Sequence, residues 1–130
     1  MHIRDFSSLA FGAITPTDID AFMDFGGKVF VIIEAKCGNA KCKPGQQLAL
    51  ERLCDACQAG GVETILILAS HPKTDEDIEY STLPVSGMRY KGKWLPGEEW
   101  TVRKLIVDFR NRVTREQIKE SNANKQKQRG

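Results

Sequence analysis

The sequence predicts a single α/β domain built around a mixed β-sheet. Two short apolar runs rich in β-branched residues, 29–33 and 62–69, have the length of buried strands. Residues 46–58 between them have helical periodicity, and a strand–helix–strand order of these lengths favours parallel pairing of the two strands. The chain of 130 residues has the size of one ordinary domain.

The N-terminal part of the chain is expected to lead into a β-hairpin. Residues 3–11 form a short mixed segment of one or two helical turns, which Thr15-Pro16-Thr17 interrupts. Residues 18–24 alternate loosely between polar and apolar side chains, as a strand does. The Gly26-Gly27 pair then predicts a turn into the buried strand over 28–36.

A loop over 37–45 precedes the helix predicted over 46–58. That helix carries an apolar stripe and ends at Gly60-Gly61. The stripe consists of Leu50, Leu53, Cys54 and Cys57. After the second buried strand we expect an exposed loop over 70–84 and a small hairpin that turns at Lys91-Gly92.

The last element expected from the sequence is a helix that opens at 96–99. Its apolar stripe consists of Val102, Leu105, Ile106, Phe109 and Val113. The periodicity fades from about Thr114. We therefore expect a folded domain over 1–115 and a basic, disordered tail over 116–130.

The overall charge is nearly balanced, but basic residues gather near the C-terminus. The net charge is +2, and apolar and charged contents of 41% and 28% are globular values. Residues 103–130 hold nine basic and three acidic residues, a bias that suits phosphate contact. No apolar run approaches the ~20 residues of a membrane span, and the N-terminus lacks the apolar core of a signal peptide. We expect a soluble, cytoplasmic protein with no membrane partner.

Charged residues end the first buried strand, in the sequence Glu34-Ala35-Lys36. Strand alternation places Glu34 and Lys36 on one face of the sheet. Two charges at the end of an apolar strand are costly to bury unless something binds them. A divalent cation beside Glu34 would do so.

The length of the preceding turn decides which carboxylate lies opposite Glu34. A two-residue turn at Gly26-Gly27 would pair Ile19 with Glu34 and direct Asp20 to the other face. A three-residue turn that includes Lys28 would pair Asp20 with Glu34. A metal site therefore predicts the three-residue turn, or a bulge with the same effect.

The expected site has the chemistry of a Mg²⁺-dependent nuclease. Asp20, Glu34 and the Ala35 carbonyl could hold Mg²⁺ or Mn²⁺, with Asp18 as the alternative or a second carboxylate. The cation would lower the pKa of a bound water and offset charge on the phosphate. Lys36 could orient or deprotonate that water, or stabilise the anion.

Several other polar side chains are candidates for contact with the substrate. Gln46, at the start of the following helix, could reach the water or the phosphate, and the N-terminus of that helix favours an anion. The candidate DNA-binding residues are Lys41, Lys43, Arg103, Lys104 and Arg110.

Three motifs of this sequence resemble those of a known family. They are Thr17-Asp18-Ile19-Asp20, Glu34-Ala35-Lys36 and Pro44-Gly45-Gln46. The family that they resemble is the PD-(D/E)XK nuclease superfamily. The resemblance covers roughly residues 14–69 and is strongest to small phage or prophage nucleases and to Holliday-junction-resolvase-like and VRR-NUC-like domains. It implies a restriction-endonuclease-like fold, a mixed sheet flanked by helices, and metal-dependent hydrolysis of DNA. It also implies that the protein is found in a bacterium or in a phage-infected host cell. We expect a homodimer.

By that likeness Asp20 matches the metal-binding aspartate of the superfamily, and Glu34, Lys36 and Gln46 match its other catalytic residues. The superfamily commonly has a glutamate on a helix before the first strand. The segment before Thr15 contains no Glu, so only Asp5 could replace it. This departure puts a second metal site in doubt.

Two other interpretations remain open. The first is a non-catalytic DNA-binding or assembly module that keeps the nuclease fold. The second is a structural zinc site, which the four cysteines at 37, 42, 54 and 57 could form. Zinc is the weaker of the two, because Cys54 and Cys57 fall inside the predicted helix, where that spacing also suits core packing.

Overall fold

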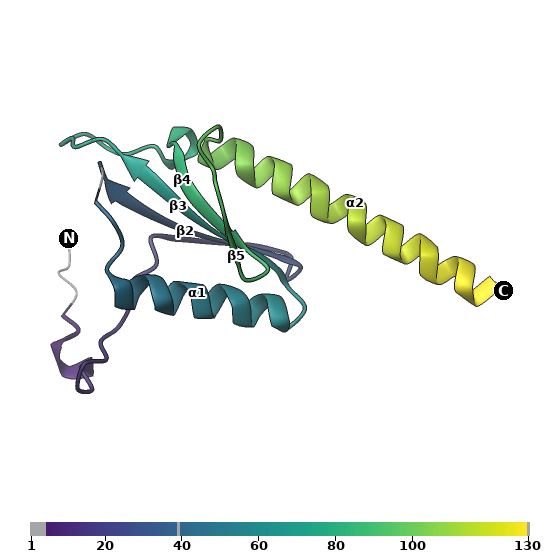
Figure 1. Ribbon diagram of the computed structural model, residues 1–130, viewed down its shortest axis with the longest axis horizontal. Helices are drawn as coiled ribbons and strands as arrows, with labels where there is room; N and C mark the ends of the chain where they lie inside the picture. The colour runs from purple at the N-terminus through teal and green to yellow at the C-terminus, as the bar shows by residue number, and fades with distance from the viewer. Residues whose placement is uncertain (1–4, 39, 130) are drawn as a thin grey trace.

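A five-stranded mixed sheet carries one helix on each of its faces (Figure 1). The computed structural model describes residues 5–38 and 40–129. The elements are the 3-10 turn η1 (Ser7–Leu9), β1 (Ala21–Phe25), β2 (Val29–Cys37), α1 (Pro44–Ala59), β3 (Glu63–His71), the 3-10 turn η2 (Tyr80–Thr82), β4 (Val85–Tyr90), β5 (Lys93–Leu95) and α2 (Val102–Arg129).

The strands are ordered β1-β2-β3-β4-β5 across the sheet. Helix α1 connects β2 to β3, and these two strands pair in parallel. The other three pairings are antiparallel. This topology confirms the predicted α/β class, the mixed sheet and the parallel pairing of the two apolar strands.

The hairpin between β1 and β2 has the three-residue turn that the metal hypothesis requires. Phe25 pairs with Val29, so three residues turn the chain. Gly26 and Gly27 adopt φ values of 67° and 74°, which favour glycine, and the Gly27 amide donates to Asp24 Oδ1 at 2.6 Å. The register continues to Ala21 opposite Ile33, and one further step along both strands places Asp20 opposite Glu34.

The two faces of the sheet bury different side chains. Alternate residues of β2 and β3, such as Val31 and Ile67, pack under α2 in a large apolar core. The intervening residues, such as Ile32 and Leu66, pack against Leu50 and Cys54 of α1 in a smaller one. Glu34 and Lys36 follow Ile32 at even spacing, so they belong to the α1 face.

Some elements differ from the sequence prediction at their ends. The structure confirms the turn at Lys91-Gly92, but the hairpin strand β4 already begins at Val85. Leu83, in the predicted exposed loop, is buried under α2. Leu53 of the predicted α1 stripe is 40% exposed, whereas Leu50 and Cys54 are buried as expected.

Helix α2 continues to Arg129, so the expectation of a disordered tail over 116–130 is wrong for residues 116–129, and residue 130 lies outside the described residues. Figure 1 shows the C-terminal part of the helix extending past the sheet. The apolar stripe ends at Val113, but residues beyond it include good helix formers such as Gln117, Lys119 and Glu120. The fading of periodicity therefore marks the end of packing, not the end of the helix.

Across residues 5–38 and 40–129, no helix combines the length and the apolar character needed to cross a bilayer. The longest helix, α2, is strongly charged in its second half.

Candidate active site

Three side chains form a closed polar cluster where β2 ends and α1 begins. Lys36 Nζ lies 2.9 Å from Glu34 Oε1 and donates to Gln46 Oε1 at 2.9 Å. Gln46 Nε2 in turn donates to Glu34 Oε1, also at 2.9 Å. The structure therefore brings together Glu34, Lys36 and Gln46, as the sequence predicts.

Glu34 is a buried acid, and only one of its two carboxylate oxygens has hydrogen-bond partners among the described residues. The residue is 2% exposed, and its Oε1 atom accepts from both Lys36 and Gln46. Its Oε2 atom is buried and has no hydrogen-bond partner in the described part of the chain. An unpaired buried carboxylate oxygen carries a desolvation cost, so this atom is poised to gain from a ligand.

Asp20 lies beside Glu34 at the same end of the sheet. Its Oδ2 atom accepts the backbone N–H of Ala35 at 2.8 Å, which holds the carboxylate against the strand that carries Glu34. Asp20 itself is exposed, so it remains open to solvent and ligands. Asp18 is also exposed and lies two residues before it, outside β1.

Lys36 is held as a cation by this arrangement. The hydrogen bond with Glu34 raises the pKa of Lys36 above its ordinary value, although burial offsets part of that effect. Asp20 contributes a further, smaller increase. At neutral pH the Lys36 side chain is therefore positively charged, and it serves better as a stabiliser of negative charge than as a base.

Tyr80 is a member of the site that the sequence analysis does not identify. It belongs to η2 and packs against the core under α2. Burial raises the pKa of the Tyr80 hydroxyl, and the neighbouring carboxylates of Asp20 and Glu34 raise it further. No sequence motif identifies Tyr80, because its approach to the site depends on how the long loop after β3 folds.

The first turn of α1 adds unsatisfied donors to the same place. Lys43 is the N-cap of α1, and no side-chain hydrogen bond caps the helix there. Pro44 has no N–H to lose, but the next amides point out of the helix start. These donors and the helix dipole favour an anion next to Gln46.

The acids of the site can hold a metal ion only with help from solvent. Among residues 5–38 and 40–129, no three His, Cys, Asp or Glu side chains gather into a metal-binding group. Asp20 and Glu34 provide two carboxylates, and the Ala35 carbonyl is the third oxygen that the sequence suggests. Mg²⁺ suits such a sparse set, because it usually keeps several waters and binds through one or two carboxylates.

Asp5, the only acid that could replace the missing N-terminal glutamate, has another contact. Its Oδ1 atom accepts the backbone N–H of Ser7 at 2.9 Å. This contact holds the pKa of the exposed Asp5 carboxyl below its usual value. Asp5 thus serves the η1 turn.

The cysteines are free thiols in different surroundings. Cys37 is exposed, Cys42 and Cys57 are partly exposed, and Cys54 is buried. Burial raises the pKa of Cys54 to about 12, and its thiol lies 3.7 Å from the carbonyl oxygens of Thr64 and Arg89. Burial also raises the pKa of Cys42, which is close enough to Lys36 to be affected by its charge.

The predicted DNA-binding residues fall into two groups that lie apart. Lys41 and Lys43 line two hollows that both include Lys36. The guanidinium of Arg110, on α2, lies 4.1 Å from the Phe25 ring, at the opposite end of β1 from Asp20. Arg103 and Lys104 also belong to α2, on the other face of the sheet from Gln46. Arg103 and Arg110 line one hollow together with Tyr80.

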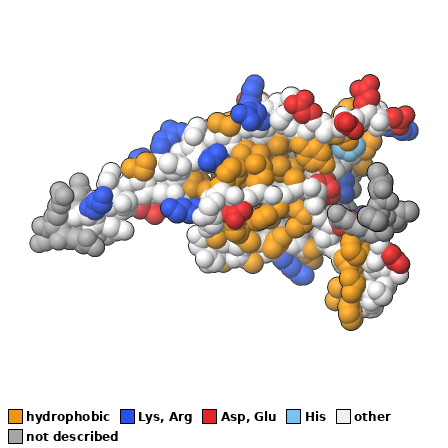
Figure 2. Space-filling view, turned by 180° about the vertical axis from the view of Figure 1, so that it is seen from behind, with side chains coloured by type: hydrophobic (Ala, Val, Ile, Leu, Met, Phe, Trp, Pro, Cys, Tyr) orange, Lys and Arg blue, Asp and Glu red, His pale blue; other side chains and the backbone are white. Residues whose placement is uncertain are grey.

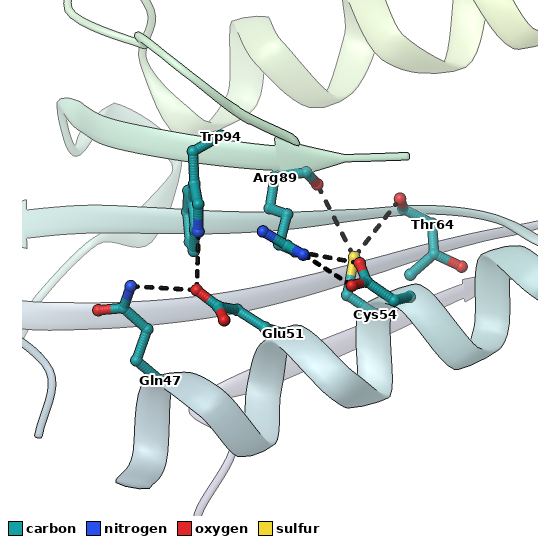
Figure 3. Close-up of polar contacts among 7 residues, drawn as sticks. Gln47, Glu51, Cys54, Thr64, Arg89 and Trp94 are labelled. Atoms are coloured by element: carbon teal, nitrogen blue, oxygen red, sulfur yellow. Dashed lines mark hydrogen bonds and ion pairs between the residues drawn. The ribbon is translucent and has the colours of Figure 1, made fainter. Parts of the chain in front are cut away.

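A second polar group on the α1 face differs from the first because its main contacts are satisfied (Figure 3). Glu51 accepts from Trp94 Nε1 at 2.7 Å and from Gln47 at 3.2 Å. Arg89 donates twice to Asp55, at 3.0 and 2.7 Å. These contacts fasten α1 to β4 and β5, and in the described part of the chain no buried side-chain nitrogen or oxygen of this group lacks a partner.

The cluster at the end of β2 thus combines two acids, a fixed cation, an amide and the positive end of a helix. Such a set can hold a divalent cation and a phosphate group side by side. No protein-family model, no curated protein and no solved structure matches this chain.

Proposed function

We propose that this protein is a metal-dependent nuclease that hydrolyses phosphodiester bonds in DNA, with a restriction-endonuclease-like arrangement of its sheet and helices. The single observation that carries the proposal is the buried Oε2 atom of Glu34, which has no partner among the described residues. It lies in a cluster with a cation, and the register sets a second acid opposite it. A structural ion pair would not need this oxygen to stay free.

Asp20, Glu34 and the Ala35 carbonyl are the groups that would hold Mg²⁺ or Mn²⁺. The bound cation would supply a water of lowered pKa and offset negative charge on the phosphate. Glu34 contributes its free oxygen to this task while its other oxygen stays bound to Gln46 and Lys36.

Lys36 and Gln46 act on the substrate directly in this proposal. Lys36, as a cation fixed at the end of β2, stabilises the charge that develops on the phosphate oxygens. Gln46 holds Lys36 and Glu34 in place through both ends of its amide and can turn that amide towards a water or phosphate. The amides of the first turn of α1 provide further donors to the same anion.

One observation favours a second function, which is a DNA-binding module without catalysis. Lys36 already neutralises Glu34 without a metal, and the described residues hold no group of three metal-binding side chains. In that case the cluster would be a structural ion pair that positions cations for phosphate contact.

A cleavage assay with a substitution at Lys36 tests the proposal. Linear duplex, branched and single-stranded DNA would be incubated with the protein and Mg²⁺ or Mn²⁺. We expect cleavage of at least one substrate, its loss with EDTA, and its loss in Lys36→Ala with DNA binding retained. Lys93→Ala is the matched control, because Lys93 is exposed on β5, at the far end of the sheet. Absence of cleavage by the unaltered protein with every metal and substrate would favour the binding module.

A further inference from the structure

A groove beside the candidate site has no role in the contacts described so far. Its volume is about 770 Å³, and it lies between the N-terminal segment 13–18 and the first three turns of α1. Lys36 and Gln46 line the groove, so it opens onto the polar cluster at the end of β2. Figure 1 shows the N-terminal segment passing the start of α1, and residues of both segments line the groove.

The charged side chains of the groove are mostly basic. Lys36, Lys43 and Arg52 line it, against the single acid Asp18. Arg52 is exposed and projects from the third turn of α1, so the positive charge extends along the groove away from Lys36. A row of cations beside the positive end of a helix attracts a chain of phosphates.

Apolar side chains lie exposed on both walls of the same groove. Ile14 is 72% exposed on the N-terminal wall, and Leu48 is 43% exposed on the α1 wall. Figure 2 shows hydrophobic side chains gathered along the N-terminal segment, which projects at the lower right of that view. Neither Ile14 nor Leu48 belongs to the two cores of the sheet, so these side chains are available to a ligand.

The N-terminal wall is held by its own backbone. Phe11 and Ile14 exchange two backbone hydrogen bonds of 2.8 and 3.1 Å around Gly12, whose φ of 64° favours glycine. This local turn therefore forms without the side chain of Ile14, so a substitution there should preserve it.

We propose that this groove binds an unpaired nucleic-acid strand and leads it to Glu34 and Lys36. A duplex presents its phosphates and keeps its base faces stacked inside, whereas an unpaired strand presents phosphates and base faces together. Cations for the phosphates and exposed aliphatic side chains for the base faces suit the second case, with van der Waals contact in place of the aromatic stacking found in many single-strand binders. The volume of about 770 Å³ falls in the range of ~300–1,000 Å³ typical of pockets that enclose a small ligand, which fits a few unpaired nucleotides better than a duplex.

The delivery of that strand to a cutting centre rests on the proposed function, but binding can be measured without cleavage. Fluorescence anisotropy in EDTA would compare a labelled single-stranded oligonucleotide with a hairpin duplex of the same sequence. We expect tighter binding of the single strand. Arg52→Ala should reduce the slope of log K against log salt by about 0.7, the value for one lost phosphate contact on a single strand. Ile14→Ser should weaken single-strand binding at every salt concentration.

Two matched controls lie outside the groove. Lys93→Ala removes an exposed cation from β5, and Leu53→Ser removes an apolar side chain that is 40% exposed on α1. We expect both to bind the single strand like the unaltered protein. Three results would overturn the inference. The duplex could bind as tightly as the single strand or more tightly, neither oligonucleotide could bind, or neither groove substitution could change binding. Equally effective competition by polyglutamate would also overturn it, because the groove would then accept any acidic chain.

The outcome for the nuclease proposal is separate. Selective binding of the single strand without cleavage under any metal would contradict the nuclease and leave the groove assignment standing. If the protein cleaves duplex DNA and both groove variants bind the single strand like the unaltered protein, the nuclease proposal stands and the groove assignment is wrong.

Discussion

The two faces of the sheet bury their side chains in different ways. Among the residues whose burial is described, the face under α2 holds fourteen buried apolar residues in one continuous core. Among the same described residues, the face under α1 holds four buried apolar residues together with the acid Glu34, and a network of polar contacts lies around them. The α2 face therefore supplies most of the hydrophobic stabilisation, while the α1 face carries the groups able to do chemistry.

Polar groups on the α1 face also differ from one another. Asp55, Glu51 and Trp94 have their partners within the protein, which fixes α1 on the sheet. Glu34 has one oxygen with no partner among the described residues. The contrast separates a structural polar network from a site that can accept a ligand, since a buried polar atom without a partner destabilises the fold unless something binds it.

The largest effect on stability is expected from the α2 core. Phe109→Ala should lower the free energy of unfolding by about 3–5 kcal/mol, because it leaves a cavity in the core and removes the edge-to-face contact with Tyr90. Leu53→Ala, at an exposed position of α1, should cost far less. Urea denaturation measures both. Equal losses in the two variants would show that the faces do not differ in this way.

The buried thiol tests whether the small core under α1 is closed. The pKa of about 12 at Cys54, compared with 9.0 for an unperturbed thiol, lowers the thiolate fraction roughly a thousandfold. Iodoacetamide should therefore modify the exposed Cys37 in the native protein and reach Cys54 only in urea. Peptide mass spectrometry reads out both sites. Fast modification of Cys54 without denaturant would mean that α1 opens readily from the sheet.

The chemical role of the α1 face is tested at its buried acid. Glu34→Gln keeps the shape of the side chain and removes its charge, so DNA cleavage should fall by about 10²–10³-fold, because a metal ion's charge stabilisation is worth several kcal/mol. Glu63→Gln, on β3 at the opposite end of the sheet, is the control. Circular dichroism would show that both variants are folded. Cleavage at the normal rate by Glu34→Gln would remove Glu34 from the mechanism.

The smallest effect is expected from the satisfied pair Asp55 and Arg89. The Arg89 guanidinium holds the pKa of Asp55 below its unfolded value of about 3.8. Its stabilisation is therefore complete above that pH and is lost as pH falls through the lower pKa of the folded state. Because Asp55 is partly exposed, the contribution should be at most about 1 kcal/mol. The difference in unfolding free energy between the unaltered protein and Asp55→Asn should be largest at pH 7 and should shrink as the pH falls below about 3.8. A difference that does not change with pH would show that the charge of the pair is not its cause.

Local signals predict part of the arrangement of Asp20, Glu34 and Lys36. Strand alternation alone sets Glu34 and Lys36 on one face. The position of Asp20 depends on the length of the glycine turn, which the sequence leaves open and the strand pairing decides. Gln46 follows from the helix that starts after the loop.

Other parts of the site depend on long-range packing, which a single sequence does not reveal. Tyr80 reaches the acids because η2 folds back from a loop of weak pattern. Arg110 is basic and near the C-terminus, but the direction of α2 places it over Phe25, away from Glu34. Whether Glu34 Oε2 has a hydrogen-bond partner likewise depends on the residues that surround it in the fold, and no residue pattern predicts that it has none among the described residues.

The central claim is that the free oxygen of Glu34 marks a metal site. Thermal unfolding in increasing Mn²⁺ or Mg²⁺ tests it most directly, because a ligand that binds only the folded protein stabilises it, by about 2.7 kcal/mol at a hundred times its Kd. The account predicts that the unfolding temperature of the unaltered protein rises with metal concentration. It predicts the same rise in Asp75→Asn, a control acid in the exposed loop after β3, and no rise in Glu34→Gln. A flat response of the unaltered protein, or an equal rise in Glu34→Gln, would contradict it.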